Sequence, residues 1–430
     1  GGQDRPLLAV SKDGLHWSRP DLGDRKPEHN DILIHTPKPE WKDTQNVVYD
    51  PDDPDPAWRY KGLLGDVNRL PAVSADCASF TPLDVPTIHS SDESQLTYDR
   101  PHHQFIATLK IFSKWGRSVG LATSTDFVHW TPVTLIFGTD DEDQHLARRI
   151  IADRLASPNL MPLGHVSPEP PPSYMPKTND LLALWACDVY NMAVFPYGNY
   201  YIGMPAIFFR TALDEKKTNT DGFHLIELTA SRDLHHWFRL GDRKAFIGPS
   251  PIDNGRLGIY DRTQLLPTSH PLVHGNELWF YYTGLKWRDC PYEFHHDGTP
   301  RPRSEWTSAE KADFDEGAGA VCLAVLRRDG FVSLDAGSDG SVLTEPIIIK
   351  GSHLHLNADA NGGRIRVELL SNSGQPIPHF SAADCMPVTD DAVDTSIDWS
   401  GHPDLSALKG QTVQIKIEMQ HASLYSLWVE

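Results

Sequence analysis

Short runs of alternating apolar and polar residues cover most of this chain, and this period of two predicts β-strands rather than helices. Four pairs of such runs are joined by bends that contain Gly, Asn, Asp or Pro, the residues that tight hairpin turns favour. These pairs span residues 47–64, 96–112, 192–209 and 265–284. The pattern therefore predicts an all-β fold in which antiparallel hairpins recur along the chain.

A turn of nearly constant wording follows a strand-like run at five places. Three copies read Ser-x-Asp-x-x-His-Trp, at residues 11–17, 124–130 and 231–237, while 74–80 is a weaker copy and 327–333 a degenerate one. Repeated β units that share a turn predict a β-propeller, whose sites lie at the mouth of the central channel. We expect the Asp of each clear turn to bind backbone amides at the edge of a blade and the Trp to pack between sheets.

A second repeat, Asp-x-x-Gln/Asn, stands at the start of each of the four hairpins. It begins at Asp43, Asp92, Asp188 and Asp261. Each unit then runs through a hairpin, a strand, a turn and an outer strand, so we predict a five-bladed β-propeller over residues 1–340. The first turn has no such motif before it, and the first blade is expected to be incomplete. We favour loss of a preceding segment; completion by another part of the chain is the alternative.

Beyond the repeats the alternation becomes strict, over residues 353–360, 364–369 and 412–419. These strands predict a separate β-sandwich over residues 341–430. The segment 138–180 is rich in proline instead, and we expect it to form a long loop near the channel mouth.

Composition narrows the choice of partners and of location. The 430 residues suit two domains, and the net charge of -19 argues against nucleic acid, although a local basic pocket for an anionic polysaccharide stays open. Five scattered cysteines without a Cys-x-x-Cys pair form neither a disulfide framework nor a zinc site, and their odd number leaves at least one thiol free. No apolar run reaches the ~20 residues of a membrane span, and the chain shows no signal peptide. We expect no membrane partner, and the oligomeric state stays open.

The four motif aspartates are the first candidates for chemistry, together with Glu93 and Glu316. Carboxylates that meet at a channel mouth repel one another, which raises the pKa of some and yields one acid and one base. Glycoside hydrolysis uses such a pair. We predict Asp43 as nucleophile or base, Asp188 as an acid or a residue that sets a pKa, and Glu93 or Asp261 as the remaining acid. Alternatively, each aspartate only caps a backbone turn.

Aromatic and polar residues near the same motifs are candidates to bind a sugar. Aromatic rings offer a sugar a large contact area at low entropic cost, and polar side chains bind hydroxyls or a carboxylate. The predicted substrate-binding residues are Trp41, Gln45, Asn46, Asp92, Arg100, His102, His103, Tyr190, Asn191, Tyr260, Arg262 and Gln264. Adjacent histidines of a strand point to opposite faces, so His pairs supply no metal-ligand set. We expect no cofactor, and a structural cation in the channel stays open.

With these features the chain resembles five-bladed β-propeller glycosidases that carry a C-terminal β-sandwich. These are the invertase/fructanase-like family, glycoside hydrolase family 32, and its arabinanase-like relatives of families 43 and 117. The Ser-x-Asp-Gly-x-His-Trp repeat, Trp41-x-Asp43-x-Gln45-Asn46 and the tail from 323–334 into 353–369 carry the likeness. The fructanase motifs Trp-x-Asn-Asp-Pro and Arg-Asp-Pro are absent, so the catalytic trio of that family is not carried over.

The resemblance and the converging Asp motifs together imply an exo-acting glycoside hydrolase. Its substrate would be a plant or algal oligosaccharide or polysaccharide, and its location secreted or periplasmic. Two alternatives stay open: a non-catalytic carbohydrate-binding propeller, and a sialidase-like or lyase-like enzyme. The turn also resembles the sialidase Asp-box, and Arg100, Arg210 and Arg262 are candidates for the arginine triad that binds a sialic acid carboxylate.

Overall fold

The computed structural model describes residues 6–23, 30–36, 38–41, 43–157, 186–211, 222–250, 259–288, 290, 292–293, 299–401 and 404–430. These residues are mostly β, in several sheets, as the alternating pattern predicted. Two α-helices accompany the sheets, α1 (Asp141–Ala156) and α2 (Ser308–Asp315). Neither helix of the described part is both long and apolar enough to cross a membrane.

The chain divides into two compact units, which are described one at a time. The first unit comprises Gly1–Pro271 and Phe280–Ala324, and the second comprises Leu272–Trp279 and Val325–Glu430. The predicted domain boundary at residue 340 stays a prediction.

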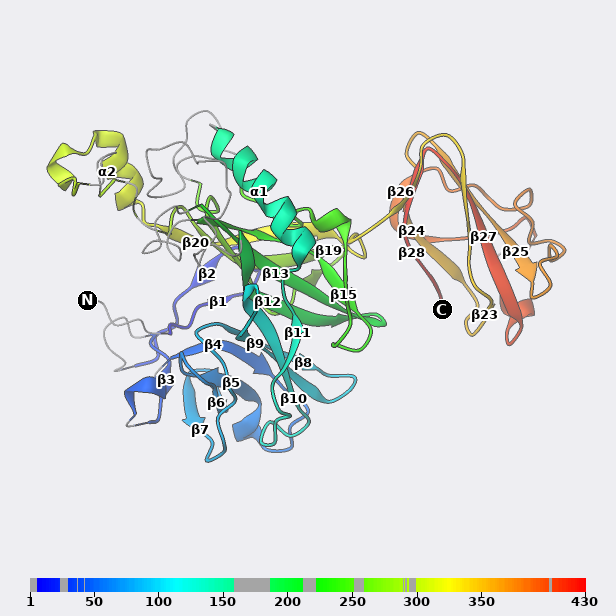
Figure 1. Ribbon diagram of the computed structural model, residues 1–430. Coiled ribbons are helices and arrows are strands. Elements are labelled where there is room, and N and C mark those ends of the chain that lie inside the picture. Colours follow the sequence, from blue (N-terminus) through cyan, green and yellow to red (C-terminus); the bar gives the residue numbers. More distant parts are fainter. Residues whose placement is uncertain are drawn as a thin grey trace. The chain divides into compact units, whose positions relative to one another are not determined.

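Four sheets dominate the first part of the chain, in blue to yellow-green in Figure 1. The first holds β3 (Leu33–Ile34), β4 (Thr44–Tyr49), β5 (Tyr60–Leu64), β6 (Leu70–Ser74) and β7 (Ser79–Pro82). The second holds β8 (Ser94–Asp99), β9 (Gln104–Ser113), β10 (Gly116–Ser124) and β11 (Thr134–Phe137). The third holds β12 (Cys187–Tyr197), β13 (Tyr200–Arg210), β14 (Gly222–Ile226), β15 (Thr229–Ser231) and β16 (Trp237–Arg239). The fourth holds β17 (Gln264–Pro267), β18 (Leu272–His274), β19 (Glu277–Leu285) and β20 (Gly319–Arg327), and β1 (Val10–Ser11) pairs with β2 (Trp17–Ser18).

The four predicted hairpins are confirmed. β4 pairs with β5, β8 with β9, β12 with β13 and β17 with β19, all antiparallel. The last hairpin also contains β18, which pairs with the beginning of β19 and was not expected. Pairing between neighbouring strands is local in sequence, which is why the alternation and the turn residues sufficed to find it.

The repeated turn is closed by its own side chains, as its third clear copy shows. Asp233 Oδ1 accepts hydrogen bonds from the amides of His235 and His236, both at 2.8 Å, and its Oδ2 lies 2.7 Å from His236 Nδ1. Trp237 Nε1 donates to the carbonyl of Leu234 at 2.9 Å. The His236 ring and these amides hold the pKa of Asp233 well below its usual range. The structural role expected for this aspartate is confirmed.

The other two clear copies of the turn repeat the bonds of the aspartate, but the tryptophan of the first copy packs differently. Asp13 and Asp126 make the same set of bonds as Asp233. Trp17, however, is 53% exposed and touches Tyr281 edge-on, so its expected packing between sheets is wrong. In the degenerate copy Asp329 accepts a hydrogen bond from Ser426 Oγ at 2.7 Å, a residue far from it in the sequence.

Part of the segment 138–180, expected as a loop, is helical. Helix α1 begins after Asp140, whose carboxylate accepts the amide of Asp143 while Asp143 bonds back to the amide of Asp140. This reciprocal cap is a strong start signal for a helix. The prolines that suggested a loop belong to residues 158–180, which lie outside the described residues.

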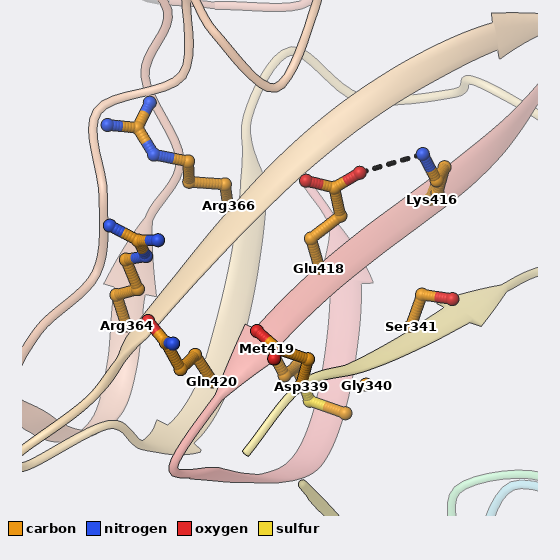
Figure 2. A pocket seen from close by; sticks show the side chains of 9 residues that line it. All are labelled: Asp339, Gly340, Ser341, Arg364, Arg366, Lys416, Glu418, Met419 and Gln420. Carbon is orange, nitrogen blue, oxygen red and sulfur yellow. Dashed lines mark hydrogen bonds and ion pairs between the residues drawn. The ribbon is translucent and has the colours of Figure 1, made fainter.

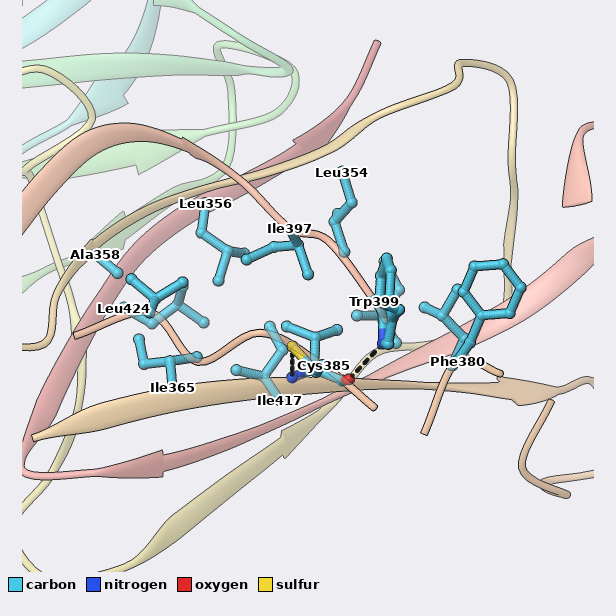
Figure 3. Close-up of a cluster of buried hydrophobic side chains, with 14 of the residues drawn as sticks. Leu354, Leu356, Ala358, Ile365, Phe380, Cys385, Ile397, Trp399, Ile417 and Leu424 are labelled. Atoms are coloured by element: carbon cyan, nitrogen blue, oxygen red, sulfur yellow. Dashed lines mark hydrogen bonds between the residues drawn. The ribbon is translucent and has the colours of Figure 1, made fainter. Parts of the chain in front are cut away.

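Two four-stranded sheets lie in the second unit, within its segment Val325–Glu430. One holds β21 (Leu334–Ala336), β24 (Leu354–Asp359), β26 (Asp391–Ser396) and β28 (Ala422–Val429). The other holds β22 (Gly340–Leu343), β23 (Ile347–Ile348), β25 (Arg364–Ser371) and β27 (Thr412–Gln420). Alternate residues of both sheets share one apolar core, in which Leu356 and Ile417 are fully buried (Figure 3). Trp399 fills its end and donates from Nε1 to the carbonyl of Val367 at 3.0 Å.

Candidate active site

Strands β4, β8, β12 and β17, each the first strand of one of the four hairpins, meet around a cavity of about 510 Å³. Side-chain hydrogen bonds tie these strands together across the cavity. Asn46 Nδ2 donates to the carbonyl of Ser94 at 2.6 Å, Gln95 Nε2 donates to the carbonyl of Pro267 at 3.0 Å, and Ser269 Oγ donates to Gln95 Oε1 at 2.9 Å. Strands fixed in this way hold the residues that precede them in place.

The motif aspartates stand at the beginnings of these strands, as predicted. Asp43 precedes β4, Asp92 and Glu93 precede β8, Asp188 is the second residue of β12, and Asp261 precedes β17. Glu93 and Asn191 line the cavity, and the buried Asn191 Oδ1 has no hydrogen-bond partner within the described structure. A buried acceptor that is left in this way is available to a ligand hydroxyl.

A buried arginine gathers three of the predicted residues. Arg69 is fully buried, and its Nη2 donates to the carbonyls of Ser91 and Asp92. Burial lowers the pKa of its guanidinium, and the charges of Glu93, Asp92 and Asp43 are among those that oppose this. Asp43, Asp92 and Glu93 therefore lie within electrostatic reach of one cation.

The neighbouring carboxylates Asp92 and Glu93 have their pKa values pushed apart. Burial alone would raise the pKa of Asp92, but its 2.6 Å ion pair with Lys110 and the charge of Arg117 outweigh burial and lower it. Burial raises the pKa of Glu93, and Lys110 and Arg69 only oppose the rise. One carboxylate is thus kept ionised while the other holds its proton to higher pH, which is the division that acid–base catalysis requires.

Asp188 has a different setting from these two. It is 3% exposed, and both of its oxygens bind Arg117 Nη1, at 3.0 and 3.2 Å. Burial raises its pKa, while Arg117 and Arg210 oppose the rise. Asp188 thus holds the guanidinium of Arg117 in position and lies within electrostatic reach of Arg210.

Asp261, Arg262 and Tyr260 belong to a separate group. Asp261 accepts hydrogen bonds from Tyr282 Oη at 2.8 Å and from Ser250 Oγ at 2.9 Å. Arg262 Nη2 lies 3.4 Å from the buried carboxylate of Asp313, which also binds Lys286 and Tyr292. Tyr260 Oη donates to the carbonyl of Glu316, and Glu316 itself lies 3.4 Å from Lys286. These contacts form a structural network, and none of the three residues lines the cavity.

Three predicted binding residues lie at the turn between β8 and β9, at the other end of β8 from Glu93. Arg100 binds both oxygens of Asp52 at 2.6 and 2.8 Å, His102 Nδ1 lies 2.8 Å from Asp99, and His103 Nδ1 lies 3.3 Å from Tyr98 Oη. All three are exposed, and their partners are Asp52, Asp99 and Tyr98; none of the three lines the cavity. Sequence proximity to Asp92 suggested them, but a strand separates them from it.

The arginine triad considered for a sialidase is likewise not assembled. Arg100 binds Asp52 and Arg262 binds Asp313, while Arg210 lies near Asp188. Two of the three guanidinium groups are therefore paired with different carboxylates, and the third lies near Asp188.

Two further predicted residues are accounted for by packing and bonding. Trp41 packs against Gly65, where φ is +91° and an added Cβ would come within 2.6 Å of the ring, so its role is structural. Gln264 Oε1 accepts a hydrogen bond from Arg288 Nη1 at 2.9 Å. The side chain of Gln45 lies outside the described part.

The sequence reasoning missed the cations of this region. They are Arg69, Lys110, Arg117 and Arg288. One signal was present, since Lys110 is a lone charge inside an apolar run and is buried at 3% exposure. A buried charge requires a partner, so a lone lysine in a core strand indicates a carboxylate nearby.

A second cavity of about 520 Å³ lies on the second unit (Figure 2). Arg364, Arg366, Lys416 and Glu418 line it, from strands β25 and β27. Lys416 Nζ binds Glu418 at 2.7 Å, and Arg366 Nη1 donates to backbone carbonyls of the loop 382–385. These charges serve the local structure.

Metal and disulfide chemistry receive no support from the described residues. They contain no group of three or more His, Cys, Asp and Glu side chains that could hold a metal ion. All five cysteines are described, and all are free thiols. The expectation of no cofactor stays a prediction.

Comparison with known proteins adds distant structural likeness. No family model and no curated protein matches this sequence. An N-acetylgalactosamine deacetylase from F. plautii is 13% identical over 74% of this chain and 80% of its own, with a TM-score of 0.41. A β-1,2-mannobiose phosphorylase from Listeria innocua is 14% identical over 70% and 68%, at 0.32. The GH32 β-fructofuranosidase of Bombyx mori is 9% identical over 89% and 75%, at 0.30. At this distance the likenesses assign neither a family nor an activity.

Proposed function

We propose that this protein is a glycoside hydrolase whose active site lies at the cavity of the first unit. Glu93 is the general acid and Asp43 is the nucleophile or base. The observation that carries the proposal is the opposed pKa values of Glu93 and Asp92 beside that cavity, with Asp43 in the field of the same arginine.

The proposed chemistry uses Glu93 in its acid form and the carboxylate of Asp43. Protonated Glu93 donates its proton to the glycosidic oxygen as the bond to the anomeric carbon breaks. The carboxylate of Asp43 either attacks the anomeric carbon or removes a proton from an attacking water, according to whether the enzyme retains or inverts configuration. Asn191, with its free buried acceptor, binds a sugar hydroxyl. Asp92 keeps Lys110 in place, and Asp188 does the same for Arg117.

We infer that the four hairpin-containing sheets built from β3 to β20 are blades of a five-bladed β-propeller and that the second unit is a β-sandwich. Contacts between β4 and β8, between β8 and β12 and between β12 and β17 support the propeller. The bond from Thr108 Oγ1 to the carbonyl of Met192, at 2.6 Å, also joins two sheets. The common core of the two sheets supports the sandwich. Exo action, a plant or algal substrate and a secreted or periplasmic location stay predictions.

The proposal is tested by hydrolysis of a broad panel of oligosaccharides, with products identified by mass spectrometry. Once a substrate is found, Glu93→Gln and Asp43→Asn are each expected to lower kcat/KM by about 10²–10⁴-fold, the usual contribution of a positioned acid or base. Both variants are expected to keep the far-UV circular dichroism spectrum of the wild type, which separates a loss of chemistry from a loss of the fold.

Arg100→Ala is the matched control. Arg100 was a candidate from the sequence but lies at the far turn of β8, so its removal is expected to leave kcat/KM unchanged. Full activity in both Glu93→Gln and Asp43→Asn would overturn the assignment. Binding of oligosaccharides without any turnover would instead favour a carbohydrate-binding protein.

A further inference from the structure

The Asp-x-x-Gln/Asn motif ends in a carboxamide, and its four copies show what this group does in the folded protein. The four side chains are those of Asn46, Gln95, Asn191 and Gln264. Asn46, Gln95 and Asn191 line the cavity of the first unit. Gln264 does not line it and accepts a hydrogen bond from Arg288. The repeat therefore allows the three carboxamides of the cavity to be compared with one another.

Two of these three carboxamides are bonded within the protein. Asn46 Nδ2 donates to the carbonyl of Ser94 at 2.6 Å, and Ser269 Oγ lies 3.5 Å from Asn46 Oδ1. Gln95 Nε2 donates to the carbonyl of Pro267 at 3.0 Å, and Gln95 Oε1 accepts a hydrogen bond from Ser269 Oγ at 2.9 Å. In both copies the carboxamide joins the first strand of one hairpin to another segment of the first unit.

The carboxamide of Asn191 differs from these two. The residue is 7% exposed, against 9% for Asn46, and its Oδ1 has no hydrogen-bond partner within the described residues. An unpaired polar atom in such a place is costly, because it has lost its bonds to water without gaining others. A half turn about the last side-chain bond exchanges Oδ1 and Nδ2, so the group can offer the cavity an acceptor or a donor. A ligand in the cavity can therefore supply the bond that the protein does not.

Asn46 and Asn191 are equivalent in their backbone as well as in the motif. The register of β4 against β5 shifts between Thr44 and Asn46, and the register of β12 against β13 shifts between Val189 and Asn191. In both strands one extra residue stands before the asparagine, as in a β-bulge, which redirects nearby side chains. Asn46 is therefore the matched reference for Asn191.

Tyr190, the residue before Asn191, does not add a stacking surface to the cavity. Lys110 Nζ lies 3.7 Å from the centre of its ring, and the guanidinium carbons of Arg117 and Arg288 each lie 5.2 Å from it. Such placements are favourable because the face of an aromatic ring carries negative potential. Tyr190 is buried, and no phenylalanine, tyrosine or tryptophan is among the described residues that line the cavity. The described wall thus offers a sugar hydrogen bonds rather than aromatic stacking.

We propose that Asn191 determines the specificity of this site, because its carboxamide binds one hydroxyl group of the sugar unit that occupies the cavity. A sugar without that hydroxyl leaves the carboxamide unpaired and is bound less tightly. The inference deepens the proposed function and rests on it in placing the substrate in this cavity.

The first test needs no ligand. Leucine is close to asparagine in size and has no polar side-chain atom, so Asn191→Leu removes the unpaired group and keeps the volume. The unfolding temperature of the full chain without ligand is expected to rise by about 2–5 °C. Asn46→Leu is the matched control, and it is expected to lower the unfolding temperature because it breaks the bond to Ser94.

The second test measures binding without turnover. The full chain carrying Glu93→Gln is applied to an array of neutral and acidic plant and algal oligosaccharides. Calorimetry then compares the oligosaccharide that binds most tightly with its monodeoxy derivatives. We expect one derivative to bind about 10-fold more weakly than its parent, as for the loss of one hydrogen bond. Adding Asn191→Leu is expected to remove this difference. Asn191→Ala is expected to do the same without filling the cavity, which separates loss of the bond from blockage.

Three results would overturn the inference: a loss of stability in Asn191→Leu as large as that in Asn46→Leu, a preference among the derivatives that survives both Asn191 variants, or no binding of any oligosaccharide of the array at millimolar concentration. Binding that depends on Asn191 with no hydrolysis by the wild type would support the inference while contradicting the proposed function. Hydrolysis by the wild type with an unchanged kcat/KM in Asn191→Ala would contradict the inference and leave the proposed function standing.

Discussion

Glu227 offers a quantitative test of the electrostatics of the first unit. The residue is 4% exposed, and its Oε2 lies 2.8 Å from Arg239 Nη1. Asp143 binds the same guanidinium, and Arg243 binds Asp143 at 2.6 Å. Burial raises the pKa of Glu227 from 4.5 to about 7, and Arg239 only partly opposes it. The folded protein therefore keeps a proton on Glu227 over a pH range in which the unfolded chain has lost it.

The sign and size of the effect follow from linkage. Because the folded pKa is raised, the stabilising contribution is fully present below pH 4.5 and is lost as pH rises through about 7. The difference between these pKa values corresponds to about 3 kcal/mol. For a unit of roughly 300 residues, that is a shift of about 5 °C in unfolding temperature.

The perturbation is Glu227→Gln, which has nearly the same shape and keeps an acceptor for Arg239 but cannot ionise. Calorimetric unfolding of wild type and variant is measured from pH 4 to pH 8. The variant is expected to gain about 5 °C relative to wild type between pH 4.5 and 7.5. Glu142→Gln is the control, since Glu142 is exposed and binds Arg243 at 3.1 Å in the same charge cluster. Parallel curves for wild type and Glu227→Gln would refute the reasoning.

Two further predictions concern stability elsewhere. Trp399→Ala removes a buried ring from the core of the second unit and the donor to the Val367 carbonyl, so it is expected to lower the free energy of unfolding in urea by about 3–5 kcal/mol. Met386→Ala, at an exposed position, is the control and is expected to change this free energy by almost nothing. Equal losses in the two variants would contradict the packing described. Asp233→Ala is expected to lower the unfolding temperature more than Asp233→Asn, because Asn retains an acceptor for the two amides of the turn; the reverse order would contradict that role.

The sequence predicted those features that depend on neighbours along the chain. The alternating pattern located the hairpins β4–β5 and β8–β9, and the Asp motifs marked the beginnings of strands. Strand pairing and turn chemistry are local, so periodicity and turn residues contain the information needed. Helix α1 had a local signal too, in the reciprocal cap of Asp140 and Asp143, which the following prolines obscured.

The Asp-x-x-Gln/Asn motif carried no information about which side chains would surround each aspartate in the folded protein. Asp43 lies in the field of Arg69, whereas Asp261 binds Tyr282 and Ser250 in a separate network. These partners come from other strands, and their arrival depends on how the sheets pack. The contacts of Lys110, Arg117 and Arg288 with the ring of Tyr190 were hidden for the same reason, since these residues lie far apart in the sequence.

The central claim is that Glu93 is a general acid. The most direct test is how the loss of kcat/KM in Glu93→Gln depends on the leaving group of the substrate. Wild type and Glu93→Gln are compared on a glycoside with a sugar leaving group and on the matching 2,4-dinitrophenyl glycoside, whose departure needs no proton. We predict a loss of about 10²–10⁴-fold in kcat/KM for the first substrate and almost none in glycosidic bond cleavage for the second. An equal loss on both substrates, or no loss on either, would contradict the account.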